Sequence, residues 1–143
     1  MKNCLVLGLL LASIGVFAQE HLDLQDQLLA EVNEYRKKNN RKPVVYNPKY
    51  QNECDEWSMF IVRNYRHNRG SQFDGEAISV KADTDYIISS FMESPGHRDI
   101  LLEKKATSIC LSVYSMPADT IKMKNSVVVM FPSYYTVIRT YKN

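Results

Sequence analysis

The apolar residues of this chain change their spacing partway along it, and that change limits the fold class. Between Leu22 and Lys38, apolar side chains recur every three or four residues, as they do on one face of a helix. A second helical pattern runs from Tyr50 to Arg66, behind an Asn47-Pro48 pair that suits a helix N-terminus. A third begins at Asp83 or Thr84 and ends before Pro95. The first part of the chain is therefore predicted to be mainly helical.

Beyond residue 107 the chain is rich in β-branched and aromatic residues, which favour strands. Three runs are predicted to be strands, at residues 108–114, 126–131 and 134–141. The segment from Met116 to Asn125 suits a hairpin connection between the first two runs, and a short strand is expected at residues 77–80. Helices that come before strands, rather than alternating with them, indicate an α+β fold with an antiparallel sheet.

The N-terminus has the pattern of a secretory signal peptide. Lys2 precedes an uncharged, largely apolar stretch that ends in Val16-Phe17-Ala18, with small residues at the −3 and −1 positions. The apolar run is shorter than the roughly 20 residues that a membrane span needs, although a retained anchor is the alternative. We therefore expect a signal peptide at residues 1–18, a single domain at residues 19–143 and no transmembrane segment after cleavage. The expected location is secreted, either periplasmic or extracellular.

Charge and cysteine content bear on the partners of the chain and on whether it has a disulfide. Cleavage after Ala18 leaves 17 basic and 16 acidic side chains, a balance that gives no reason to expect a nucleic-acid partner. Of the three cysteines, Cys54 and Cys110 remain in the predicted mature chain. In an oxidising compartment two thiols suggest one disulfide, but each lies in an apolar-periodic segment, where a buried free thiol is equally consistent.

The run Ser94-Pro95-Gly96-His97 has the pattern of a helix start, with Ser94 as the N-cap and Pro95 at the first helical position. His97 then lies in the first turn, where the positive end of the helix dipole disfavours a protonated imidazole. A neutral imidazole can bind a metal or accept a proton. We do not expect Ser94 to act as a nucleophile with His97 as its base, because an N-cap hydroxyl bonds to backbone amides and no nucleophile-elbow pattern surrounds it.

Four side chains are candidates for a shared site, namely His67, Glu76, Glu93 and His97. Two imidazoles provide neutral nitrogen ligands, and a carboxylate can ligate a metal or orient an imidazole through its second nitrogen. Such a set suits Zn²⁺ or another divalent cation, with the histidines as ligands and the glutamates as further candidates. No organic cofactor is expected. Each residue also has a plain structural interpretation: a solvated loop residue for His67, a residue bonded to nearby backbone for His97, a strand-edge charge for Glu76 and a solvated helix end for Glu93.

Arginines recur at helical spacing around His67, at Arg63, Arg66 and Arg69. The plain interpretation is a solvated basic face. A site for a phosphate or a lipid headgroup is the alternative.

Four stretches along the chain, taken in order, carry a resemblance to a known family. They are Asn33-Glu34-Tyr35-Arg36, then Trp57 followed by His67, then Gly75-Glu76-Ala77-Ile78, and finally Phe91 to Leu101, which is close to a bacterial W-x-x-S-P-G-H-R-x-N signature. Together they resemble the CAP superfamily, the SCP-like fold of cysteine-rich secretory, antigen 5 and pathogenesis-related 1 proteins. The sequence departs from that pattern at Phe91 (usually tryptophan), Ala77 (usually asparagine) and Cys110 (usually glycine).

The resemblance implies a three-layer α-β-α sandwich with a central antiparallel sheet. It also implies that His67, His97 and Glu76 face a shared cleft, with Glu93 as a fourth member. It favours a secreted module that presents this cleft to an extracellular protein, glycan or lipid.

Two other function classes stay open. In a hydrolase of peptide or ester bonds, His97 and His67 would handle protons or hold a metal-bound water, and Glu76 would orient one of them. In a lipid or sterol carrier, the fold would enclose an apolar ligand, although so short a chain leaves few long loops for this.

Overall fold

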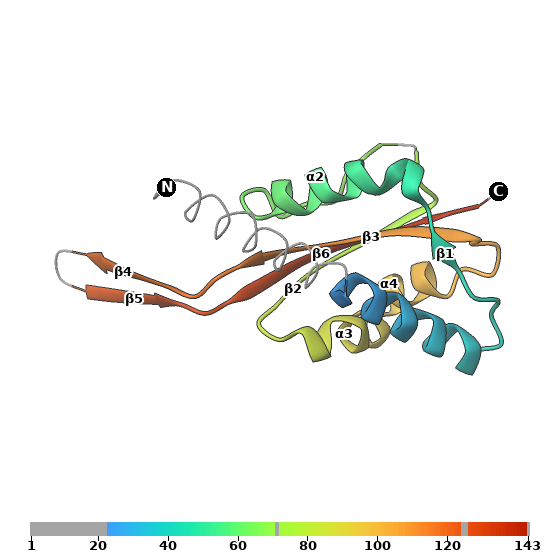
Figure 1. The fold of residues 1–143 in the computed structure, drawn as a ribbon, viewed down its shortest axis with the longest axis horizontal. Helices are drawn as coiled ribbons and strands as arrows, with labels where there is room; N and C mark the ends of the chain where they lie inside the picture. Colours follow the sequence, from blue (N-terminus) through green and yellow to red (C-terminus); the bar gives the residue numbers. More distant parts are fainter. Residues whose placement is uncertain (1–22, 71, 124–125, 143) are drawn as a thin grey trace, which may run out of the picture.

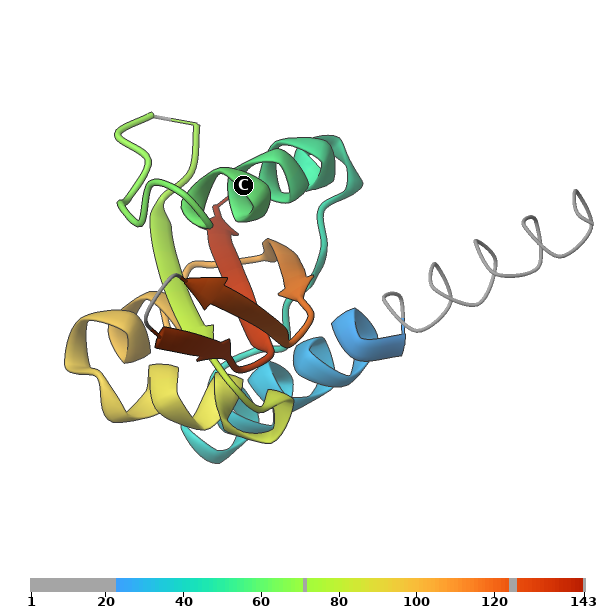
Figure 2. The ribbon, with the colours of Figure 1, turned by 90° about the vertical axis from the view of Figure 1, so that its left-hand side faces the viewer.

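Helices lie on both faces of a four-stranded sheet, as Figures 1 and 2 show. The computed structural model describes residues 23–70, 72–123 and 126–142. One face of the sheet is covered by α2 (Gln51–Ile61), and the other by the first helix (residues 23–38), α3 (Ile87–Glu93) and α4 (Pro95–Leu101). This is the α-β-α sandwich that the family resemblance implies. The predicted signal peptide lies outside the described residues, within which no helix has the length and apolar character to cross a membrane.

The sheet has the strand order β1-β3-β6-β2. Its long strands, β2 (Gly75–Lys81), β3 (Ser108–Met116) and β6 (Ser133–Tyr141), are antiparallel where they pair, as expected. The short strand β1 (Val45–Tyr46) joins β3 in parallel, so the sheet as a whole is mixed. A segment of two residues has no periodicity from which its direction could be predicted.

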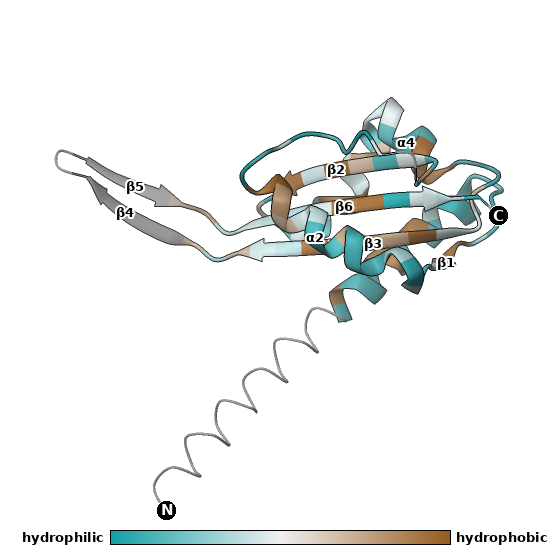
Figure 3. Cartoon of the chain, turned by 90° about the horizontal axis from the view of Figure 1, so that it is seen from above, coloured by the Kyte–Doolittle hydropathy of each residue, from teal (hydrophilic) through white to brown (hydrophobic). Residues whose placement is uncertain are grey.

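Alternation along the strands divides the core into two apolar layers, and Figure 3 shows brown, apolar segments along all three long strands. The layer beneath the sheet packs against the first helix, α3 and α4, and includes Ala77, Leu111, Ile138, Leu28 and Phe91. The layer under α2 includes Ile78, Cys110, Val137, Cys54 and Ile61. Because successive side chains of a strand point to opposite faces, Glu76 and Arg139 share the α2 side with this second layer.

Asn33 and Arg36 on the first helix hold two connections in place, the one that leads from this helix to β1 and the one that leads from α4 to β3. Asn33 accepts a hydrogen bond from Val44 N–H at 2.8 Å and donates one to Val44 O at 3.0 Å. The fully buried guanidinium of Arg36 donates to backbone carbonyls on both connections. Those carbonyls belong to Lys42, Leu101, Glu103 and Ala106. The Asn33-to-Arg36 motif therefore fixes the chain between α4 and β3 against the first helix.

Two predictions about the second helix are wrong. Asn47 does not cap it, because its side-chain Nδ2 donates to Ser108 Oγ at 3.0 Å instead, and a short 3-10 turn, η1 (Pro48–Tyr50), comes first. The helix ends at Ile61 rather than at Arg66. The residues after Ile61 leave the helix for the loop that carries His67 to the start of β2. The third helical segment opens as predicted, since Asp83 accepts a hydrogen bond from Asp85 N–H before the 3-10 turn η2 (Thr84–Tyr86).

The predicted hairpin between residues 108–114 and 126–131 is also wrong. The long strand β3 pairs with β6, while β4 (Asp119–Met123) and β5 (Ser126–Met130) form a separate two-stranded sheet that projects beyond the sandwich (Figure 1). Met116 pairs with Ser133 and Asp119 with Met130, so Pro117 stands opposite Pro132 without a change of register. The sequence pattern hides β4 because its five residues include two charged ones and only one β-branched apolar residue.

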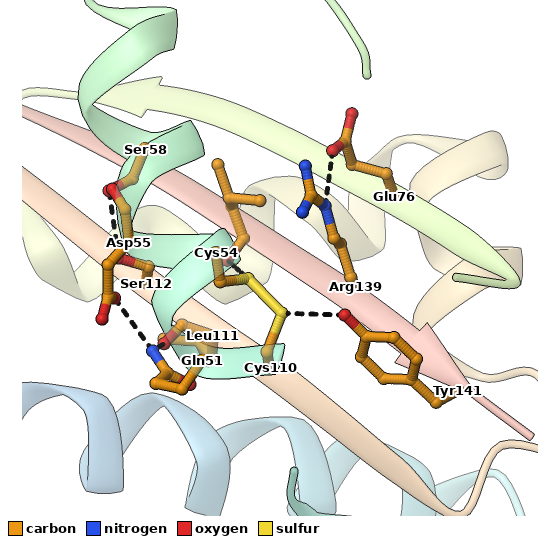
Figure 4. Close-up of a disulfide and its surroundings, with 11 residues drawn as sticks. Gln51, Cys54, Asp55, Ser58, Glu76, Cys110, Leu111, Ser112, Arg139 and Tyr141 are labelled. Atoms are coloured by element: carbon orange, nitrogen blue, oxygen red, sulfur yellow. Dashed lines mark hydrogen bonds and ion pairs between the residues drawn. A yellow bond between two sulfur atoms is a disulfide. The ribbon is translucent and has the colours of Figure 1, made fainter. Parts of the chain in front are cut away.

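A disulfide joins Cys54 of α2 to Cys110 of β3, with a Cα–Cα distance of 6.2 Å (Figure 4). The alternative of two buried free thiols is therefore excluded. The bond ties α2 to the middle of the sheet. Beside it, the hydroxyl of Tyr141 lies 3.3 Å from Cys110 Sγ, and the Tyr141 ring stacks on Tyr50 with 4.4 Å between ring centroids.

Candidate functional site

Glu76 on β2 is a buried carboxylate, with only 3% of its side chain exposed, and both of its oxygens accept hydrogen bonds. Oε2 accepts one from Arg139 Nε at 2.8 Å, and Oε1 accepts one from the Asn68 backbone N–H at 2.7 Å. Figure 4 shows the Arg139 side chain reaching from β6 toward Glu76. Both oxygens of Glu76 are therefore held by donors, one on β6 and one in the loop that carries His67. Glu76 does lie on an edge strand of the sheet, but its side chain is buried and ion-paired.

Sequence reasoning missed Arg139, which is only 1% exposed. Its guanidinium lies over the ring of Phe73, with 4.6 Å to the centroid, and at 5.6 Å from that of Trp57. The missed signal is its place in the strand, because Arg139 shares the inward face of β6 with Val137 and Tyr141. A charged residue at an inward strand position needs a buried partner, and Glu76 lies directly across the pairing of β2 with β6.

His67 lies in the loop between α2 and β2, and Glu76 sets its orientation. Its Nδ1 atom is 3.2 Å from Glu76 Oε1, while 54% of the side chain stays exposed. An imidazole whose Nδ1–H donates to a carboxylate carries its free lone pair on Nε2. That is the arrangement by which a carboxylate orients a metal-binding or proton-accepting histidine.

His97 lies in the first turn of α4, near His67. The two ring centroids are 6.2 Å apart with an angle of 47° between the planes, and the rings of His97 and Phe91 form a T-shaped pair. Burial lowers the pKa of His97 below the usual value for histidine, and the neighbouring His67 lowers it further. His97 therefore favours the neutral imidazole, the direction that the sequence predicts, but the causes are desolvation and His67 rather than the helix dipole.

Gly75 allows α4 to approach β2 closely. A Cβ atom at this position would lie 2.9 Å from Cγ2 of Ile100 and 3.2 Å from Oγ1 of Thr140. Both distances are shorter than ordinary contacts, so a larger residue would push α4 away from the sheet edge. Because α4 also carries His97, the glycine supports the approach of His97 to His67.

Glu93 and Ser94 form no hydrogen bond or ion pair with His67, Glu76 or His97 among the described residues. Glu93 is exposed at the end of α3, and within the described part of the chain it has no hydrogen bond or ion pair. Ser94 occupies the N-cap position of α4, but its side chain makes no capping hydrogen bond, contrary to our expectation. No hydrogen bond joins Ser94 to His97 among the described residues, which gives the serine no base. Of the four candidates, the structure joins His67 and Glu76 directly and brings His97 beside them.

A pocket of about 630 Å³ opens beside His67. The described residues that line it are Trp57, Arg66, His67, Asn68 and Arg69. It lies between the end of α2 and the loop that follows it.

The histidine pair can provide part of a metal site. In residues 23–70, 72–123 and 126–142, no three His, Cys, Asp or Glu side chains gather into a metal-binding group. Two imidazoles that share one tetrahedral Zn²⁺ have ring centroids roughly 5 Å apart, so the observed 6.2 Å requires only a modest side-chain rotation. Glu76 already accepts bonds at both oxygens, so it fits the role of orienting His67 better than that of a direct ligand. The donor set therefore fits a divalent ion held by two nitrogens and open elsewhere.

Comparison with known proteins relates this geometry to a family. The sequence pattern of the CAP (cysteine-rich secretory protein) family matches residues 29–131. No curated protein matches the chain closely enough to count as a relative.

Three solved structures resemble the fold. An outer surface protein from Borrelia burgdorferi has a TM-score of 0.58 and 13% identity, over 85% of this chain and 94% of that one. An extracellular protein containing a SCP domain from Bacillus anthracis strain Ames has a TM-score of 0.58 and 16% identity, over 85% and 41%. A cysteine-rich secretory protein from Staphylococcus aureus Mu50 has a TM-score of 0.51 and 19% identity, over 85% and 39%. The chain thus spans about two fifths of the latter two proteins, and at these identities the likeness shows the fold alone.

Proposed function

Because the chain belongs to the CAP (cysteine-rich secretory protein) family, we propose that it is a secreted binding module whose cleft at His67 and His97 holds a divalent cation. The cation, with the pocket beside it, contributes to recognition of an extracellular protein, glycan or lipid. Secretion is supported by the pattern of residues 1–18 and by the descriptions of two structural neighbours as extracellular or secretory proteins.

The observation that carries this proposal is the ordered contact from Arg139 through Glu76 to His67. Arg139 fixes one oxygen of Glu76 at 2.8 Å, and the other oxygen lies 3.2 Å from Nδ1 of His67. A half-exposed loop histidine gains little stability from such precise support, whereas a ligand histidine needs it. The ion would supply positive charge and open coordination positions, and the chain's own residues would hold and orient it.

The environment of each histidine supports a specific role in this proposal. His67 would bind through Nε2, because Nδ1 faces Glu76. His97, neutral near neutral pH, would contribute the second nitrogen without first losing a proton.

The test is Zn²⁺ binding to the wild-type protein and to His67→Ala and His97→Ala, measured by isothermal titration calorimetry. Glu93→Gln is the matched control, since Glu93 lies near His97 in sequence but is exposed and has no hydrogen bond or ion pair among the described residues. We expect one site in the wild type and in Glu93→Gln, and at least tenfold weaker binding in each histidine variant. Equal Zn²⁺ uptake by all four proteins would refute the proposal.

A further inference from the structure

We propose that the pocket beside His67 binds an oxyanion, the carboxylate or phosphate group of the ligand that the module recognises. The pocket is the one lined by Trp57, Arg66, His67, Asn68 and Arg69. This inference rests on the proposed binding role, but it assigns a separate chemistry to separate residues and does not require the metal.

The walls of the pocket offer hydrogen-bond donors and positive charge. Arg66 and Arg69 each provide a guanidinium, and no acidic residue is among the described residues that line the pocket. The carboxylate of Glu76, which contacts His67, is buried and already accepts hydrogen bonds at both oxygens. The positive charge of the pocket is therefore not neutralised from within it. Since the whole chain is almost balanced in charge, this local excess does not merely reflect a basic protein.

Two buried donors, one on a residue that lines the pocket and one behind it, lack an acceptor in the described part of the chain. They are the indole Nε1–H of Trp57 and the Nη2 group of Arg139, whose side chain is 99% buried. The guanidinium of Arg139 lies 5.6 Å from the centre of the ring of Trp57, which lines the pocket, so Arg139 stands behind the pocket wall rather than in it. A buried donor without an acceptor is unfavourable, and a ligand oxygen that bonds to it removes that penalty.

The packing of Trp57 argues for an anionic group rather than a stacked sugar ring. One neighbour is Phe60, stacked with 4.5 Å between ring centroids, and the other is Arg139. Because Phe60 and Arg139 pack against the ring, it is poorly placed to stack on a sugar. Arg66 also lies over the Phe60 ring, at 5.3 Å from its centroid, which holds its guanidinium near the pocket. A planar guanidinium forms paired hydrogen bonds with carboxylates and phosphates.

Binding can be followed by intrinsic fluorescence, because Trp57, which lines the pocket, is the single tryptophan of the chain. Tryptophan fluorescence of the mature protein is followed during titration with inorganic phosphate and, separately, with succinate as a carboxylate. Sodium chloride keeps the ionic strength constant, and all buffers are stripped of divalent ions on a chelating resin. The double variant Arg66→Gln/Arg69→Gln removes both guanidinium groups. The single variant Arg63→Gln is the matched control, since Arg63 belongs to the same stretch but does not line this pocket.

We expect a saturable fluorescence change with at least one of the two anions. Binding should weaken by about tenfold or more in the double variant and stay within about twofold of wild type in Arg63→Gln. These arginines are exposed, so the substitutions should leave folding intact, which urea denaturation verifies. Tighter binding of phosphate would indicate a phosphorylated ligand, and tighter binding of succinate an acidic one; either supports the proposal.

Two results would overturn it. One is the absence of a saturable signal with both anions, and the other is equal weakening in Arg63→Gln and in the double variant. Failure of the metal proposal is distinguishable, because Zn²⁺ uptake depends on His67 and His97, whereas this assay excludes divalent ions and alters neither histidine.

Discussion

Arg139 and Glu76 lie directly opposite each other on β6 and β2, and the register of the two strands places Arg139 Nε 2.8 Å from Glu76 Oε2. The sheet therefore fixes one oxygen of the carboxylate, and the loop that carries His67 adds a hydrogen bond from Asn68 N–H to the other. Since the same carboxylate orients His67, the exposed part of the site depends on a buried ion pair.

Removal of one partner of this pair should destabilise the fold strongly. Glu76→Ala leaves the buried guanidinium of Arg139 uncompensated, and we expect the free energy of unfolding to fall by about 3–5 kcal/mol. The double variant Glu76→Met/Arg139→Met should recover much of that loss, because it leaves no buried charge. Urea denaturation measures both, with His67→Ala as a control that should cost less than 1 kcal/mol, as about half of its side chain is exposed. A double variant as unstable as Glu76→Ala would contradict this account.

The lowered pKa of His97 makes stability depend on pH in a defined direction. The unfolded chain takes up a proton near pH 6.5, while the folded chain takes it up only at lower pH. As the pH falls below about 6.5, this residue therefore favours unfolding, and the loss levels off below the folded-state pKa. His97→Gln should lose less stability than the wild type between pH 7 and pH 5. NMR titration of the ring gives the pKa directly, and His67→Asn should raise it by removing the neighbouring charge.

The approach of α4 to β2 should tolerate no side chain at residue 75. Gly75→Ala places a methyl group against Ile100 and Thr140, and we expect a loss of about 1–3 kcal/mol from crowding. Shortening the neighbour should relieve it, so Ile100→Ala should cost less in the Gly75→Ala background than in the wild type. Thermal denaturation of the four proteins in this cycle tests the argument. Additive losses would show that Ile100 is not the residue that is crowded.

The disulfide should account for a large share of the stability. Cys54 and Cys110 are 56 residues apart, and in the chain-entropy model a loop of that length stabilises the folded state by about 4 kcal/mol. The variant Cys54→Ala/Cys110→Ala should therefore unfold at a clearly lower denaturant concentration than the oxidised wild type. A reducing agent should move the wild type toward the variant and leave the variant itself unchanged. Equal midpoints for all these samples would contradict the prediction.

The sequence predicts the layers of the fold because long amphipathic segments leave a clear periodicity. Leu28 and Val32 on the first helix, and Ile87 and Phe91 on α3, are buried as their spacing indicates. Short segments show no clear periodicity. The parallel pairing of β1 and the presence of β4 could therefore not be predicted. Strand partners depend on contacts between distant parts of the chain, which local periodicity does not encode.

The candidate site was predictable only in part, because local motifs are visible in the sequence and strand pairing is not. His67 and His97 belong to motifs that can be recognised in sequence, and the structure brings them together. Arg139 belongs to none, and its role follows only from the register that places it across from Glu76. Glu93 belongs to the same motif as His97, but it lies exposed at the C-terminal end of α3.

The facing prolines Pro117 and Pro132 divide one long β-ribbon into two segments that can open separately. Proline has no backbone N–H, so neither residue can donate a hydrogen bond at the boundary between the β3–β6 pair and the β4–β5 pair. Loss of the outer pairing therefore removes no hydrogen bond from the inner one. Amide hydrogen exchange in the outer segment should proceed by local opening, at rates independent of global stability. A protease could thus cleave the outer hairpin while Arg139, on the inner ribbon, still holds Glu76 in place.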